Sequence, residues 1–159
     1  FFVAAACIQL RLACNLFDGM VAVEGGFKTK SGEIYNELPD RFADVLILAG
    51  AGYSMPSSGW LQTLGWMAAA LAVITAYVRA MGVAAGAGQY FLGPMAKPHR
   101  MAVMTVACLG LGVISWIRGV LMFRARWDLM EVTLLVICAG CLVTIARRVS
   151  RIARDLESK

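Results

Sequence analysis

The sequence has little charge and almost no histidine. Charged residues make up 16% of the 159 residues, and His99 is the one histidine. Hydrophobic residues make up 60%, and the mean hydropathy is +0.71. Soluble domains carry about 25% charged and about 45–50% apolar residues. The composition therefore excludes an ordinary soluble domain and predicts an integral membrane protein with a single domain over 1–159.

The chain also lacks the polar clusters that would indicate a disulfide framework or a zinc site. Five cysteines are present, and all lie in apolar runs: Cys7, Cys14, Cys108, Cys138 and Cys141. Cys138 and Cys141 have the spacing of a redox motif, but their apolar neighbours favour a packing role. We find no internal repeat, and no basic leader precedes the first apolar run.

Five apolar segments predict an all-α protein with five membrane-spanning helices. The expected spans are 1–18, 32–52, 60–78, 101–123 and 130–146. About 20 apolar residues in a helix cross a bilayer. The first run is short for a span, so we expect the sequence to begin inside a helix. A Gly- and Pro-rich loop is expected over 82–99, and the basic tail 147–159 is predicted to be helical and cytoplasmic.

Lysine and arginine are distributed unequally between the two ends of these spans. One end carries ten: Lys28, Lys30, Arg79, Lys97, Arg100, Arg147, Arg148, Arg151, Arg154 and Lys159. The other end carries three: Arg118, Arg124 and Arg126. The end with ten basic residues is predicted to be cytoplasmic. The net charge of +5 is therefore explained by topology, and no nucleic-acid partner is expected.

Acidic and amide residues gather at the cytoplasmic ends of the first two spans. Positions 33, 36, 37, 40 and 44 form one helical stripe, and Asn15 and Asp18 are three apart on the neighbouring helix. Carboxylates cost about 2.5–3.5 kcal/mol each near a bilayer centre and less near its edge, so they require partners. Two interpretations are open: a salt-bridge network with Arg11 and Arg41, or a hard-cation site that holds Mg²⁺ or Ca²⁺ against a phosphate.

The spacing of these residues resembles a family signature. The pattern is Asn15-x2-Asp18-Gly19-x2-Ala22-Val23-x8-Gly32-x3-Asn36-x3-Asp40. It is similar at every interval to D-x2-D-G-x2-A-R-x8-G-x3-D-x3-D of the CDP-alcohol phosphatidyltransferases. Asn replaces two aspartates and Val replaces the arginine. Two later stretches also resemble the family: Tyr77-x-Arg79-Ala80, and Gly93-x3-Lys97-Pro98-x-Arg100.

The resemblance implies a fold and an activity. Family members have six spans, so the first would be missing here, and they commonly form homodimers. In these enzymes an alcohol attacks the phosphate that joins diacylglycerol to CMP, and a phospholipid forms as CMP leaves. The expected setting is a bilayer, the bacterial inner membrane, with the active site on the cytoplasmic face. The acceptor is expected to be a small alcohol or polyol phosphate.

The resemblance also implies roles for individual residues. Asp40 would be the catalytic base. Mg²⁺ or Mn²⁺, with Ca²⁺ able to replace them, would be bound by Asn15, Asp18, Asn36 and Asp40. The CDP group would lie against Asp18, Gly19, Ala22 and Gly32. An acceptor phosphate would be bound by Arg79, Lys97 and Arg100.

The replacements keep other functions open. Two amides remove two negative charges from the expected metal site, which Glu33, Glu37 and Asp44 could partly restore. A catalytically inactive member that binds lipid or serves a structural role is therefore the alternative. A channel or transporter with an acidic vestibule is less favoured, because the outer halves of the spans, such as 45–50, are almost wholly apolar.

Overall fold

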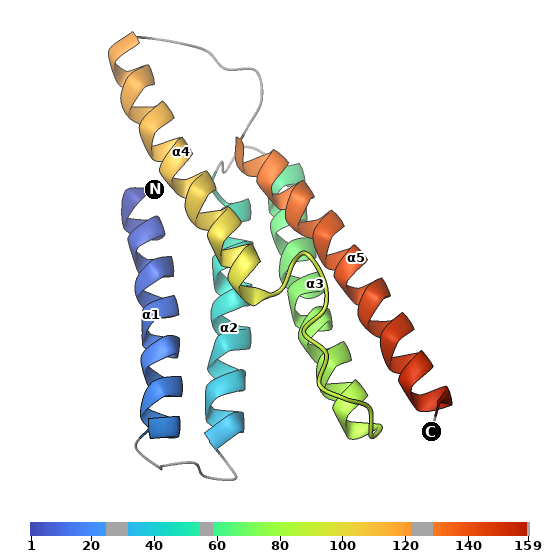
Figure 1. The fold of residues 1–159 in the computed structure, drawn as a ribbon. Coiled ribbons are helices and arrows are strands. Elements are labelled where there is room, and N and C mark those ends of the chain that lie inside the picture. The colour runs from blue at the N-terminus through green and yellow to red at the C-terminus, as the bar shows by residue number, and fades with distance from the viewer. Residues whose placement is uncertain (25–31, 55–58, 122–128, 159) are drawn as a thin grey trace.

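The computed structural model describes residues 1–24, 32–54, 59–121 and 129–158, and every element in them is an α-helix. The five helices are α1 (Phe2–Glu24), α2 (Gly32–Gly52), α3 (Gly59–Ala84), α4 (Lys97–Leu121) and α5 (Leu129–Glu157). Successive helices run in opposite directions, so the end of α1, the start of α2 and the ends of α3 and α5 point the same way (Figure 1). The expected all-α architecture is confirmed for the described residues.

Four of the five helices are long and apolar enough to cross a membrane. These segments are Phe2–Val21, Gly59–Ala84, Lys97–Ile117 and Leu129–Glu157. α2 is also 21 residues long, but it carries Glu37, Asp40, Arg41 and Asp44, and it is not among the four. The prediction of a membrane-embedded helical protein is therefore supported, and the prediction of five apolar spans holds for four helices.

Several helices are longer than their apolar runs. α1 continues past Asp18 to Glu24, and α3 continues past Val78 to Ala84. α4 begins at Lys97 rather than Met101, so the expected loop 82–99 shrinks to 85–96. Pro98 fits the first turn of α4, where a missing backbone N–H costs nothing. The expected tail helix is confirmed, because α5 is continuous to Glu157; the expected end of α4 at Phe123 lies outside the described residues.

Small residues let the central helices approach closely. α2 packs on α3, and α3 packs on α5. A Cβ added at Gly65 would lie 2.8 Å from the Cα of Gly52, so the α2 and α3 backbones are nearly in contact. Ala68 and Ala72 are fully buried along the same helix. Close packing through small residues is the usual way that helices associate inside a membrane.

The α3–α4 connection turns back beside α3 and is fastened to α5 (Figure 1). The backbone N–H of Met95 donates to Thr144 Oγ1 at 3.1 Å, and Arg148 Nε donates to the carbonyl of Leu92 at 2.9 Å. Gly93 lies between these two bonds with a φ of 122°. This connection fixes where α4 begins, and so places Lys97 and Arg100 opposite the acids of α2.

We expect Gly93→Ala to destabilise the protein. The positive φ is unfavourable for any side chain, and a Cβ there would lie 2.5 Å from Thr144 Cγ2. Backbone strain of this kind costs about 1–3 kcal/mol, before the steric clash is added. Thermal unfolding in detergent would measure it, with Gly50→Ala as the control, because a Cβ at Gly50 meets nothing within 4 Å. Equal melting temperatures for the two variants would contradict the expectation.

Candidate functional site

The acidic stripe of α2 borders a cavity of about 290 Å³, which we call the cationic cavity. All five helices and the 85–96 connection contribute to its wall. The lining residues are Asn15, Asn36, Glu37, Asp40, Arg41, Thr75, Ala76, Arg79, Phe91, Ala96, Lys97, Pro98, Arg100 and Arg148. The fold therefore brings together Asp40, both predicted amide ligands (Asn15 and Asn36) and all three predicted acceptor-phosphate residues.

Asp40 is buried on the wall of this cavity, and both of its carboxylate oxygens are engaged. Oδ1 accepts from Arg11 Nη2 at 3.0 Å and from Asn15 Nδ2 at 2.9 Å. Oδ2 accepts a hydrogen bond from Lys97 Nζ. Arg11 also donates to the backbone carbonyl of Asp40 at 3.0 Å. Residues from α1 and α4 thus fix the position and the orientation of the Asp40 side chain.

Asp44 lies one turn further along α2 and is fully buried. Its Oδ2 is 2.9 Å from Arg100 Nη2, and its Oδ1 is 3.0 Å from Arg11 Nη1. Arg100, itself 1% exposed, also donates to Thr75 Oγ1 at 3.0 Å. A buried charge without a partner is strongly destabilising, so Asp44 and Arg100 depend on each other. Arg100 borders the cavity but serves mainly to hold α2, α3 and α4 together.

Glu37 forms the more accessible part of the network. One carboxylate oxygen pairs with Arg41 at 3.0 Å, and the other pairs with Arg79. The Arg79 guanidinium also lies over the Phe91 ring, 5.1 Å from its centroid. Ion pairs that are partly exposed to solvent contribute little to stability. The Glu37 pairs can therefore rearrange around a ligand at lower cost than the Asp44 pairs.

Arg148 is a cavity residue that we did not predict from the sequence. It is buried, and it donates to the carbonyls of Leu92 at 2.9 Å and Thr75 at 2.7 Å. Within the described residues it has no acidic partner. The sequence places Arg148 only among the basic residues of the predicted cytoplasmic end. The available signal was its helical spacing from Cys141 and Thr144, which places it on the buried face of α5.

The lining of the cavity carries a positive excess. Five side chains are cationic: Arg41, Arg79, Lys97, Arg100 and Arg148. Two are anionic: Glu37 and Asp40. The formal excess is three positive charges. Arginine and lysine side chains in this arrangement suit phosphate or diphosphate oxygens, which accept charge-assisted hydrogen bonds.

The predicted metal ligands are only partly assembled. Asn15 is in contact with Asp40, and Asn36 lines the same cavity, but Asp18 is exposed on α1 and is not in the lining. The described residues contain no group of three acidic, histidine or cysteine side chains able to hold a metal. Asn15 also turns its amide nitrogen, not its oxygen, toward Asp40. This donor set, as arranged, does not fit Mg²⁺, Mn²⁺ or Ca²⁺, so the metal stays a prediction.

Three of the predicted CDP-binding residues, Asp18, Gly19 and Gly32, are not in the lining of the cationic cavity. Gly19 is on the exposed side of α1, where an added Cβ would meet nothing within 4 Å. Gly32 is the first residue of α2. The side chains of Ala22 and Glu33 are outside the described part of the structure. The structure therefore leaves open space beside Gly19 but does not bring Gly19 or Gly32 to the cavity wall.

An apolar groove of about 460 Å³ lies along α2 and α3 and borders the cationic cavity. It is lined by Ile34, Glu37, Leu38, Arg41, Val73, Ala76, Tyr77, Arg79, Ala80, Val83 and Gln89. Four of these residues, Glu37, Arg41, Ala76 and Arg79, also line the cavity. The cationic cavity thus offers positive charge directly beside an apolar surface.

Comparison with known protein families, with characterised proteins and with solved structures gave no match. The resemblance to CDP-alcohol phosphatidyltransferases therefore rests on the motif residues and their spacing.

Proposed function

We propose that this protein transfers a phosphatidyl group from a CDP-linked lipid, such as CDP-diacylglycerol, to an alcohol and releases CMP. The observation that carries the proposal is that the cationic cavity and the apolar groove are adjacent and share four wall residues. A lipid with a phosphate head could occupy both at once, with its phosphates among the basic residues and an acyl chain along α3. The motif spacing favours a CDP-lipid as the donor.

The reaction needs a proton acceptor beside the phosphate. The acceptor oxygen attacks the phosphorus that bears the diacylglycerol, the bond from that phosphorus to CMP breaks, and the hydroxyl proton passes to Asp40. Asp40 is the candidate for this role because it holds the motif position of the family's proposed base and lies on the cavity wall. Phosphoryl transfer depends mainly on positioning and charge neutralisation, which the surrounding cations supply.

We propose Arg79, Lys97 and Arg148 as the residues that bind an acceptor phosphate. All three line the cavity, and Arg148 has no acidic partner among the described residues. Arg100, predicted for the same role, donates to Asp44 and Thr75. The acceptor would then be a sugar or polyol phosphate. We also propose that the protein forms a homodimer in the bacterial inner membrane, with the site on the cytoplasmic face. These points rest on the resemblance and on the charge distribution.

Arg79→Gln is expected to weaken binding of the acceptor more than binding of the lipid donor. A hydrogen bond to a charged group contributes about 1.5–3 kcal/mol, so the KM for a polyol phosphate should rise about 10- to 100-fold. The KM for CDP-diacylglycerol should change much less, because other cavity cations remain. Steady-state CMP release, with each substrate varied in turn, measures the split. Arg79→Lys should recover part of the loss, and equal rises in both KM values would assign Arg79 to general anchoring instead.

Filling the apolar groove is expected to weaken binding of the lipid donor. Ala80 lines the groove but not the cavity, so Ala80→Trp should raise the KM for CDP-diacylglycerol about tenfold while leaving the acceptor KM near its original value. Ala70→Trp is the matched control, because Ala70 is exposed on α3 and lines neither site. The proposal also requires acyl chains on the donor. Equal CMP release from water-soluble CDP-glycerol would show that the groove takes no part.

A non-catalytic lipid-binding protein is the second candidate. It is favoured by the contacts of Asp40, because both carboxylate oxygens already have basic or amide partners. Amides at positions 15 and 36 also reduce the number of carboxylates. In that case CDP-diacylglycerol should bind with its phosphates in the cationic cavity, yet no acceptor should release CMP from it.

A further inference from the structure

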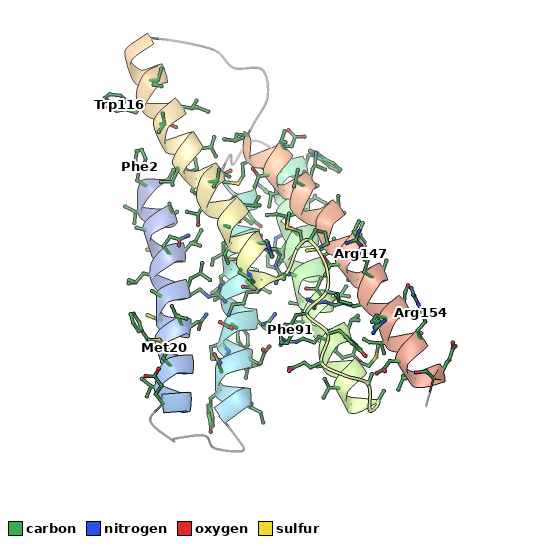
Figure 2. The ribbon with its side chains drawn as sticks, viewed as in Figure 1. Phe2, Met20, Phe91, Trp116, Arg147 and Arg154 are labelled. Atoms are coloured by element: carbon green, nitrogen blue, oxygen red, sulfur yellow. The ribbon has the colours of Figure 1, made fainter. Side chains whose placement is uncertain are left out.

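A second pocket, of about 370 Å³, lies at the C-terminal half of α5 and shares no residue with the cationic cavity. We call it the basic pocket. Its lining residues are Leu92, Gly93, Ala146, Arg147, Ser150, Arg151 and Arg154. Figure 2 shows Arg147 and Arg154 on the same stretch of α5. None of the residues that we assign to phosphatidyl transfer lines this pocket.

Three arginines converge on the basic pocket. Positions 147, 151 and 154 are spaced by four and three residues, so they share one face of the helix. Arg151 lies over the Tyr90 ring at 5.5 Å, and Arg154 Nε donates to the carbonyl of Ser150 at 3.2 Å. Among the described residues, none of the three arginines forms an ion pair. Their positive charges are therefore available to an anion.

The depth of the pocket matches the headgroup layer of a bilayer. From Leu129 to Ala146 an α-helix rises about 26 Å, close to the roughly 30 Å of a hydrocarbon core. Arg147 then lies at the edge of the core, and Arg151 and Arg154 lie about 6 and 10 Å beyond it. Lipid phosphates occupy this zone. Leu92 and Ala146 add apolar surface to the pocket wall.

We propose that the basic pocket binds the phosphate group of an anionic membrane lipid, at a site separate from the transfer site. Arginine matches phosphate because its fork of N–H groups can bond two oxygens at once. Basic clusters just outside a membrane helix attract anionic lipids by about 1 kcal/mol per residue. A free phosphate would contact the same arginines but would leave the apolar Leu92 and Ala146 surface without a partner.

The test uses the full chain in dodecyl maltoside, titrated with dioleoyl phosphatidic acid and followed by native mass spectrometry. Arg151→Gln with Arg154→Gln should weaken one bound lipid about 30-fold, as expected for two lost charges. Replacement of both by Lys should retain most of the affinity. Arg124→Gln with Arg126→Gln removes the same charge from residues predicted on the opposite membrane face, and it should leave binding unchanged.

Three results would overturn the proposal. The first is wild-type affinity for phosphatidic acid in the Gln double variant. The second is equal binding of phosphatidylcholine, whose headgroup carries no net charge. The third is displacement of the lipid by inorganic phosphate at the same concentration, which would assign the pocket to a free phosphate. None of these readouts depends on CMP release, so the result is independent of the proposed transfer activity.

Discussion

Asp40→Asn should lower acceptor-dependent CMP release from CDP-diacylglycerol about 10²- to 10⁴-fold, the usual contribution of a general base. The amide has nearly the same shape, and its oxygen can still accept from Arg11 and Asn15, although its nitrogen cannot accept from Lys97 Nζ. It cannot take the proton from the acceptor hydroxyl. The rate at saturating concentrations of both substrates should therefore fall more than either KM changes.

Glu37→Gln provides the comparison for this experiment. Glu37 is the other acid of the cavity, but it is more exposed and pairs with Arg41 and Arg79 rather than with residues of α1. Its replacement should reduce turnover much less than Asp40→Asn does. Thermal unfolding of both variants would show whether they are folded. Turnover of a folded Asp40→Asn protein within a few-fold of the wild type would exclude Asp40 as the base.

Asp44→Ala should lower the free energy of unfolding by about 3–5 kcal/mol, the usual cost of removing one partner from a buried ion pair. Arg100 would be left with its positive charge at 1% exposure, and Thr75 and the Met95 carbonyl cannot neutralise it. Arg11 would keep Asp40 as its partner. Thermal unfolding in detergent, with a ligand-free sample, measures this loss.

A double variant separates the charge effect from simple loss of packing. Asp44→Leu with Arg100→Met removes both charges and keeps most of the volume, and buried pairs replaced in this way often lose little stability. The double variant should therefore be more stable than Asp44→Ala. Equal destabilisation of the two would mean that the uncompensated charge of Arg100 is not the cause.

The helices of this protein could be predicted from the sequence because their signal is local. An apolar run such as 60–78 is sufficient to predict a spanning helix. The polar ends were harder to place. Residues 97–100 form the start of α4, and residues 79–84 form the end of α3, although neither stretch is wholly apolar. Polar residues at a membrane surface can continue a helix, so hydropathy alone underestimates its length.

The site could be predicted only in part, because its contacts join distant parts of the chain. Arg11 and Arg41 do pair with the acids of α2, as one of the two open interpretations required. Lys97 and Asp40 are 57 residues apart in the sequence, and their pairing depends on where the 85–96 connection places the start of α4. Arg148 reaches the cavity for a similar reason, through its bond to Leu92 on that connection.

The most direct test of phosphatidyl transfer follows both products in one reaction. The full chain would be incubated with CDP-diacylglycerol, labelled separately in the cytidine and in the glycerol, and with a panel of sugar and polyol phosphates. If the protein transfers a phosphatidyl group, at least one acceptor should give CMP and a labelled phospholipid in equal amounts, and neither product should form without acceptor. Binding of CDP-diacylglycerol with no CMP release for any acceptor would contradict the transfer activity and favour the lipid-binding alternative.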